Sequence, residues 1–257
     1  MDNFLKQYRN RCEAKLRTRG FTLHKNAFFR IANDVLQSGY IEKLGAYSYG
    51  RECRVAFAVL PLCQKLEGRN IADGVGLYYL KNFEICHWNE RDGWHYKIEK
   101  NSINSCIDEI MRYFDTYLIP FFDCANSCKT ALPELIKLEQ TFNDIRRAGL
   151  KLDGIEDKEA HGDKLFFLDS SKCYMALKNG DYAFALKCLE VLLTQNVVAL
   201  QSLQNNRFVT EESIKERRIG IEKIQNEICQ AKAKNIEYFQ SLMSENEAYT
   251  RESLKNM

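Results

Sequence analysis

The sequence predicts an α+β protein with an N-terminal helix, a sheet of about five mostly antiparallel strands, and an all-helical second half. Three observations predict this class. Apolar residues recur with helical spacing at the start of the chain, apolar and polar residues alternate between residues 21 and 98, and helical spacing returns after Asn101. One helix before a run of strands, with helices after it, is typical of an α+β layer rather than a doubly wound sheet.

The first helix is predicted over about residues 4–19. Its apolar stripe repeats every four residues: Phe4, Tyr8, Cys12 and Leu16. Gly20 follows, as a glycine often does just past a helix end. The other faces are basic, since residues 1–30 hold eight Lys or Arg and two acids. Such a face can bind nucleic acid, but we favour a solvated helix surface and expect no nucleic-acid partner.

Strands are predicted in the segments 21–24, 28–36, 40–49, 54–62, 75–80 and 94–98. A chain reversal near Gly39 separates the second segment from the third. Segment 54–62 is apolar at both alternating sets of positions, so we expect a central strand that is buried on both faces.

Helices are predicted from Asn101 onward. Ser102 can cap the first of them, because a serine hydroxyl accepts a hydrogen bond from the first turn of a helix. Its apolar stripe extends from Ile103 to Phe121, and residues 132–142 form the next helix.

The second half opens after residues 149–163, which are rich in Gly and Asp and indicate the main loop. We therefore expect an α+β domain over residues 1–148 and a helical domain over residues 164–257. The helical domain begins with a helical hairpin, formed by residues 165–178 and 182–203.

A long helix is predicted from Thr210 to the end of the second domain. Residues spaced by seven mark one stripe: Ile214, Ile221, Ile228, Asn235, Leu242 and Tyr249. This is a heptad pattern with a polar core position at Asn235, and Gly220 is a candidate interruption. A coiled coil that forms a homodimer is one interpretation. We favour packing of the stripe on the hairpin of the same chain.

Common catalytic signatures do not occur in the sequence. It lacks a G-x-x-x-x-G-K-[S/T] phosphate-binding loop, a G-x-S-x-G nucleophile elbow and an H-E-x-x-H zinc helix. Cys124 and Cys128 have metal-like spacing, but a structural zinc site usually needs two such pairs. We therefore assign no catalytic residue, metal or cofactor, and leave open whether the chain is an enzyme.

A cluster of aromatic and histidine residues is the candidate ligand site. Two histidines and both tryptophans flank the turn 89–93, so a hairpin there brings them together. Aromatic rings beside a titratable histidine are typical of ligand pockets, although ordinary sheet faces also use Trp and Tyr. The candidate residues on this sheet are Tyr47, His87, Trp88, Trp94 and His95.

The composition favours a cytoplasmic location without a membrane partner. The N-terminal segment lacks the apolar core of a signal peptide. The longest apolar run, Val55 to Cys63, is far shorter than the roughly 20 residues of a membrane helix. Ten cysteines in such a chain are expected to be reduced thiols, and a net charge of +2 requires no acidic partner.

Several short segments carry a resemblance to a known family. They are AKLRTRGF at residues 14–21, NAFFR at 26–30, DVLQ at 34–37 and VAFAV at 55–59. This pattern resembles the bacterial "domain of unknown function 4304" family, whose members open with a short helix ending in Gly-Phe and an aromatic-Arg strand. Their closing helix is similar to residues 103–122. The resemblance covers at most residues 1–140 and implies a bacterial, cytoplasmic α+β domain, without an activity.

These observations favour a non-enzymatic protein-interaction protein, immunity-like or regulatory, whose partner is another protein. An alternative is a small-molecule-binding protein or enzyme that uses the aromatic and histidine cluster. A third hypothesis is nucleic-acid binding through the basic first helix.

Overall fold

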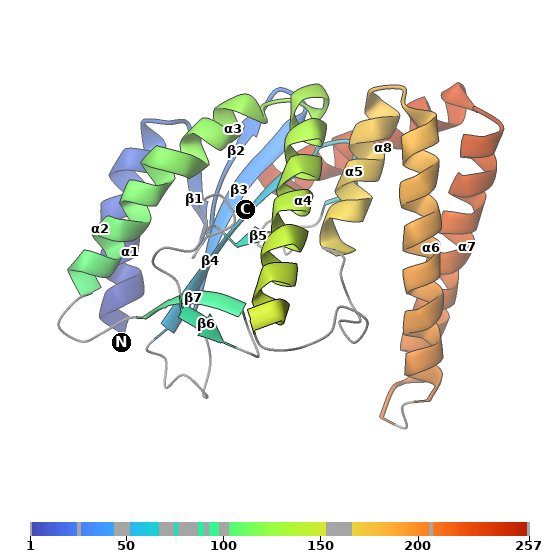
Figure 1. The fold of residues 1–257 in the computed structure, drawn as a ribbon. Helices are drawn as coiled ribbons and strands as arrows, with labels where there is room; N and C mark the ends of the chain where they lie inside the picture. The colour runs from blue at the N-terminus through green and yellow to red at the C-terminus, as the bar shows by residue number, and fades with distance from the viewer. Residues whose placement is uncertain are drawn as a thin grey trace.

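The structure is a computed structural model that describes residues 2–24, 27–43, 52–66, 75–76, 87–89, 93–97, 103–152, 166–205 and 208–255. Helices and an antiparallel sheet make up this part of the chain (Figure 1), which confirms the α+β class. The elements are α1 (Asp2–Arg17), β1 (Thr22–His24), β2 (Ala27–Ala32), β3 (Val35–Lys43), β4 (Glu52–Pro61), β5 (Val75–Gly76), β6 (His87–Asn89), β7 (Gly93–Lys97), α2 (Ile103–Tyr113), η4 (Phe114–Leu118), α3 (Ile119–Cys124), α4 (Cys128–Leu152), α5 (Phe166–Lys178), α6 (Tyr182–Gln204), α7 (Glu211–Lys232) and α8 (Ile236–Lys255).

Strand β4 is the centre of the sheet. Strands β1 to β4 are successive antiparallel neighbours, β4 also pairs with β5 and β7, and β6 pairs with β7. The described residues thus form a sheet of seven strands, where the sequence predicts about five. Phe57 and Val59 pack into the core that the helices share, whereas Ala58 and Leu60 pack into a second core on the other face. The predicted strand with two buried faces is confirmed.

The β2–β3 hairpin turns at Asn33 and Asp34, so the predicted reversal near Gly39 is wrong. Asn33 has a φ of 51°, a left-handed conformation that asparagine tolerates better than most residues. Gly39 lies inside β3, opposite Phe28. The phenyl ring of Phe28 fills the space of a side chain at position 39, which explains why a glycine occurs inside a strand.

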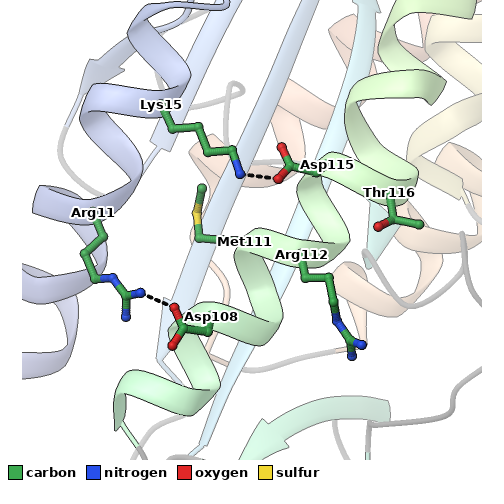
Figure 2. Close-up of a pocket in the computed structure, with 7 residues that line it drawn as sticks. All are labelled: Arg11, Lys15, Asp108, Met111, Arg112, Asp115 and Thr116. Carbon is green, nitrogen blue, oxygen red and sulfur yellow. Dashed lines mark hydrogen bonds and ion pairs between the residues drawn. The ribbon is translucent and has the colours of Figure 1, made fainter.

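Helix α1 ends as its sequence predicts. Gly20 has a φ of 79°, and Phe21 N–H donates to the Leu16 carbonyl at 3.0 Å, the pattern of a Schellman motif. The predicted stripe is confirmed for Tyr8, Cys12 and Leu16, which are all buried. On the side that faces α2, Arg11 and Lys15 form ion pairs with Asp108 and Asp115 (Figure 2).

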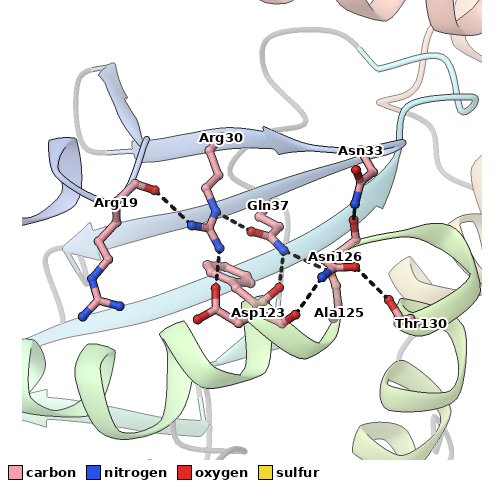
Figure 3. A network of polar contacts seen from close by, with 9 residues as sticks. Arg19, Arg30, Asn33, Gln37, Asp123, Ala125, Asn126 and Thr130 are labelled. Carbon is pink, nitrogen blue, oxygen red and sulfur yellow. Dashed lines mark hydrogen bonds and ion pairs between the residues drawn. The ribbon is translucent and has the colours of Figure 1, made fainter.

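A buried glutamine ties the sheet to the end of α3. Gln37 is fully buried on β3, and its Nε2 donates to the carbonyls of Phe122 and Ala125 (Figure 3). Its Oε1 accepts a 2.6 Å hydrogen bond from Arg30 Nε, and Arg30 also pairs with Asp123 at 2.9 Å. The network satisfies carbonyls at a helix C-terminus that have no partner within the helix.

The helical stripe predicted from Ile103 to Phe121 is interrupted by one π-helical turn, η4, directly before α3, whose second residue is Pro120. Proline has no N–H for the preceding turn, and a π-bulge is one way a helix accommodates this loss. The next helix, α4, is longer than predicted and extends to Leu152, so the predicted loop at 149–163 begins inside it.

The predicted hairpin of α5 and α6 is confirmed. Gly180 has a φ of 77°, and Asp181 N–H donates to the Ala176 carbonyl at 2.9 Å, which is a second Schellman motif. The Asp181 carboxylate accepts a 3.0 Å hydrogen bond from Phe184 N–H and thereby caps α6.

The prediction of one long terminal helix is wrong in one respect. The helix ends and a second helix begins around residues 233–235. Lys234 has a φ of 51°, and Asn235 N–H donates to the Gln230 carbonyl at 3.0 Å. Asn235 is therefore not a heptad core position: it is exposed, and its side-chain oxygen accepts a 3.1 Å hydrogen bond from Tyr238 N–H of α8. Gly220 lies within α7 and does not interrupt it.

The two terminal helices pack within the chain. Helix α7 lies along α6 (Figure 1), as predicted for its apolar stripe. Helix α8 reaches back to the segment after β4, where Thr250 Oγ1 accepts from Leu66 N–H at 3.0 Å and donates to the Gln64 carbonyl at 2.8 Å. Asn246 adds a 3.1 Å bond to the Cys63 carbonyl, and Leu254 packs on the second core.

Candidate interaction surface

The predicted ligand residues lie in the least described part of the sheet. Tyr47 is outside the described residues. His87, Trp88, Trp94 and His95 lie on the β6–β7 hairpin, where the register pairs His87 with His95 and Trp88 with Trp94. Because successive strand positions alternate between faces, the histidine positions share one face and the tryptophan positions the other. The hairpin is therefore as predicted, but its register divides the cluster into two pairs.

Two of the described cysteines, Cys12 and Cys128, are buried and do not have the environment of catalytic thiols. Burial raises the pKa of Cys12 to about 12, and the neighbouring Cys63 thiol and burial together raise the pKa of Cys128. A thiol with a raised pKa is a poor nucleophile. Cys124 is exposed whereas Cys128 is buried. Among the described residues, no group of three or more His, Cys, Asp and Glu is placed to hold a metal ion.

The groove between α1 and α2 is lined by charges that neutralise one another (Figure 2). Arg11 and Lys15 face Asp108 and Asp115, and Arg17 pairs with Glu13 at 2.5 Å. These pairs neutralise three of the basic side chains on the candidate nucleic-acid face of α1. The groove has no buried charged group aimed into it, as far as its described lining shows.

A different surface stands out, on α6. Helix α5 covers the first half of α6, where Ala185, Cys188 and Leu189 are buried. Every residue of α6 from Glu190 to Gln204 is exposed or half-buried. No residue after Glu190 in this helix is charged, and eight are aliphatic: Val191, Leu192, Leu193, Val197, Val198, Ala199, Leu200 and Leu203.

In the first half of α7, as in the second half of α6, no residue is fully buried. Residues 211–220 are exposed or half-buried, and Ile219 is 55% exposed. We call residues 191–205 of α6 and 208–220 of α7 the arm. Figure 1 shows α6 and α7 side by side, extending past the end of α5. The exposed apolar side chains of the arm are Val197, Val198, Phe208 and Ile219.

The arm carries balanced charge. Within it, residues 208–220 contain three acids and three bases, all on α7: Glu211, Glu212, Glu216, Lys215, Arg217 and Arg218. A surface without net charge does not attract nucleic acid or an anionic lipid surface by long-range electrostatics. Its chemistry instead fits an apolar protein surface.

Comparisons of the chain with protein-family models, with curated proteins and with solved structures find no match.

Helix α6 also meets the length and composition of a membrane-spanning helix, which is weak evidence by itself, and only 17% of its most apolar window is buried. The apolar composition of α6 is a signal in the sequence that could have identified this helix as a candidate interaction surface. In the sequence, however, an apolar helix in a hairpin looks the same whether neighbours cover it or not.

Proposed function

We propose that the chain is a non-catalytic protein-interaction protein that binds its partner through the arm. The observation that carries this proposal is the uncharged, aliphatic second half of α6, which projects beyond α5 and is not buried by the described residues. A regulatory or immunity-like role in the bacterial cytoplasm is a narrower form of the same proposal.

Energetics support the proposal. Full burial of a valine or leucine side chain contributes roughly 1.5–3 kcal/mol. Val198 and Ile219 are each 55% exposed and Val197 is 37% exposed, so covering them recovers part of that free energy. Contiguous apolar patches are uncommon on soluble monomers and usually mark an interaction site.

Site-specific photo-crosslinking in the native cells tests the proposal. A benzophenone amino acid replaces Val198 on the arm or, as a control, exposed Ser244 on α8. We expect protein adducts, identified by mass spectrometry, at position 198 and not at position 244. If both positions give the same adducts, or neither gives any, the arm is not a protein-binding surface.

A further inference from the structure

We propose that Cys63 and Cys128 are a redox-active pair, which a small-molecule disulfide such as oxidised glutathione converts to a disulfide bond between the segment after β4 and the start of α4. Two features of the structure support this pairing. Both cysteines are anchored beside one residue of the β2–β3 turn, and both lie where the sheet meets the helices of the second half. Oxidation of the pair does not depend on whether the arm binds a protein.

Asp34, in the turn between β2 and β3, anchors both cysteines. Leu62 N–H, one residue before Cys63, donates to the Asp34 carbonyl at 2.9 Å. The Cys128 thiol donates to the same carbonyl at 3.7 Å, and Cys128 N–H donates to Asp34 Oδ1 at 2.9 Å. The side chains of Cys63 and Cys128 lie within hydrogen-bonding range of each other. A disulfide forms only between residues whose backbones are already close, so this common anchor favours a bond between the two.

The fold tolerates the loss of both S–H groups. The Cys63 thiol donates to the Tyr174 carbonyl of α5 at 3.6 Å, and a thiol is a weak hydrogen-bond donor. Tyr174 lies four residues before Lys178, the last residue of α5, so its carbonyl accepts a hydrogen bond within the helix as well. The Asp34 carbonyl keeps the Leu62 N–H. Oxidation of the two thiols therefore leaves neither carbonyl without a donor.

The pair lies where the sheet, α4, α5 and α8 meet. Asn246 of α8 donates to the Cys63 carbonyl at 3.1 Å, and Asn179, in the turn after α5, donates to the Cys128 carbonyl at 3.2 Å. The two cysteines are 65 positions apart in the sequence. A disulfide that closes a loop of this length lowers the entropy of the unfolded chain, so the oxidised chain resists unfolding more strongly. We call this bond the latch.

Thiol–disulfide exchange forms the latch in two steps. The thiolate of one cysteine attacks a sulfur of oxidised glutathione, which forms a mixed disulfide and releases one glutathione thiolate that takes up a proton. The thiolate of the second cysteine then attacks the protein sulfur of the mixed disulfide and releases the second glutathione. Two protein S–H bonds become one S–S bond, and the S–S bond of the oxidant becomes two S–H bonds. The two electrons pass from the cysteines to glutathione.

Burial makes the exchange slow in the folded chain. Cys63 is 1% exposed and Cys128 is fully buried, so the oxidant reaches them only when the junction opens transiently. The neighbouring Cys63 thiol and burial both raise the pKa of Cys128, which keeps the thiolate scarce near neutral pH. The same burial protects the bond, once formed, from reducing thiols. Formation of the latch is therefore expected to be slow and to accelerate as the pH rises.

Peptide mapping of the wild-type chain tests the pairing without any substitution. The folded protein is kept in an equimolar buffer of oxidised and reduced glutathione, quenched with acid, unfolded in an alkylating reagent and digested for mass spectrometry. We expect one disulfide, between the peptides that contain Cys63 and Cys128, and alkylation of the other cysteines. Alkylation of both residues, a lasting glutathione adduct on either, or a disulfide to another cysteine overturns the proposal.

Thermal unfolding of the same samples tests what the latch does. Oxidation is expected to raise the unfolding midpoint of the wild-type chain by about 5–15 °C, because the bond constrains the unfolded state. Cys63→Ala and Cys128→Ala are each expected to show no rise. Cys188→Ala removes a different buried thiol, on α6, and is the matched control that should show the full rise.

Two results of the unfolding experiment contradict the latch. One is an unchanged midpoint for wild-type protein that carries the linked peptides, which shows that the bond does not hold the fold. The other is a full rise in Cys63→Ala, which assigns the effect to other cysteines.

Discussion

Gly39 lies opposite Phe28 in the β2–β3 ladder, and the phenyl ring of Phe28 occupies the space that any side chain at position 39 needs. Phe28 is itself 1% exposed and contacts the rings of Phe21 and Phe114, so it has no room to move aside. The glycine and the phenylalanine therefore act as one packing unit.

Gly39→Ala is expected to lower the free energy of unfolding by about 1–3 kcal/mol, because the added methyl overpacks this core. Urea unfolding monitored by circular dichroism measures the change. Gly220→Ala introduces the same methyl into open space and should not destabilise the folded chain. Equal unfolding midpoints for Gly39→Ala and the wild type would show that Phe28 is placed elsewhere.

Gln37→Leu is expected to destabilise the chain by about 2–4 kcal/mol, although it preserves the volume of the side chain. The substitution removes the donor to the carbonyls of Phe122 and Ala125 and the acceptor for Arg30. A buried polar group that loses its partner costs roughly 1–3 kcal/mol. Thermal unfolding measures the loss. Gln240→Leu, at an exposed position of α8, is the control and is expected to have little effect.

Lys234→Gly is expected to stabilise the chain by about 1 kcal/mol. Lys234 occupies the left-handed position of a Schellman motif with a φ of 51°. A residue with a Cβ loses roughly 1–2 kcal/mol in that conformation, whereas glycine does not. Gln225→Gly, at an exposed position in the interior of α7, should instead destabilise the chain by about 0.5–1 kcal/mol. The two substitutions are therefore expected to change the free energy of unfolding in opposite directions. Chemical denaturation of both variants measures these changes.

Glu227 makes the stability of the folded chain depend on pH. It is 4% exposed, its Oε1 has no hydrogen-bond partner among the residues that the structure describes, and Lys223 Nζ lies 3.9 Å from this oxygen. Burial raises the pKa of Glu227 above its ordinary value of 4.5, while Lys223 lowers it by a smaller amount. The tyrosines beside it, Tyr174 and Tyr238, also have raised pKa values.

A carboxyl whose pKa is higher in the folded state stabilises that state fully only below the unfolded pKa, and the contribution is lost as pH rises through the folded pKa. Glu227→Gln is therefore expected to be more stable than the wild type near pH 7, by about 1–2 kcal/mol, and the difference should shrink toward pH 4. Urea midpoints across this range measure it. Gln240→Leu, the exposed control on α8, removes no titratable group and should show no such trend.

Local signals explain which elements the sequence predicts. The α1 stripe, Gly20 and Gly180 each act within one helical turn, so spacing alone locates them. The sequence does not reveal the chain reversal at Asn33, because asparagine is a weaker turn signal than the glycine six residues later. Gly39 is a glycine because Phe28 packs against it, and not because the chain turns there. The helix end at Lys234 has no glycine or proline beside it, and the heptad pattern extends past it. The sequence therefore does not predict that the helix ends there.

The interaction surface escapes sequence reasoning for a different reason. Val197 and Val198 of the arm are aliphatic, like the buried Ala185 and Leu189 earlier in the same helix. What makes them a surface is the start of α5 at Phe166, a tertiary fact that periodicity does not encode. The β6–β7 hairpin shows the converse. Its existence follows from the sequence, but the register that divides the histidine positions from the tryptophan positions does not.

The hydrogen bonds of Thr250 and Asn246 to the segment after β4 join residues more than 180 positions apart. On the ribosome, the contacts of α8 with this segment and with the second core therefore form only after α8 emerges, although α1 to β4 emerge early. At about 5–20 residues per second this delay is of the order of ten seconds or more. During that interval Leu36 and Leu60 lack the packing of Leu254 on their face of the sheet, and nascent chains stalled before residue 236 should be the form that chaperones hold and proteases cut.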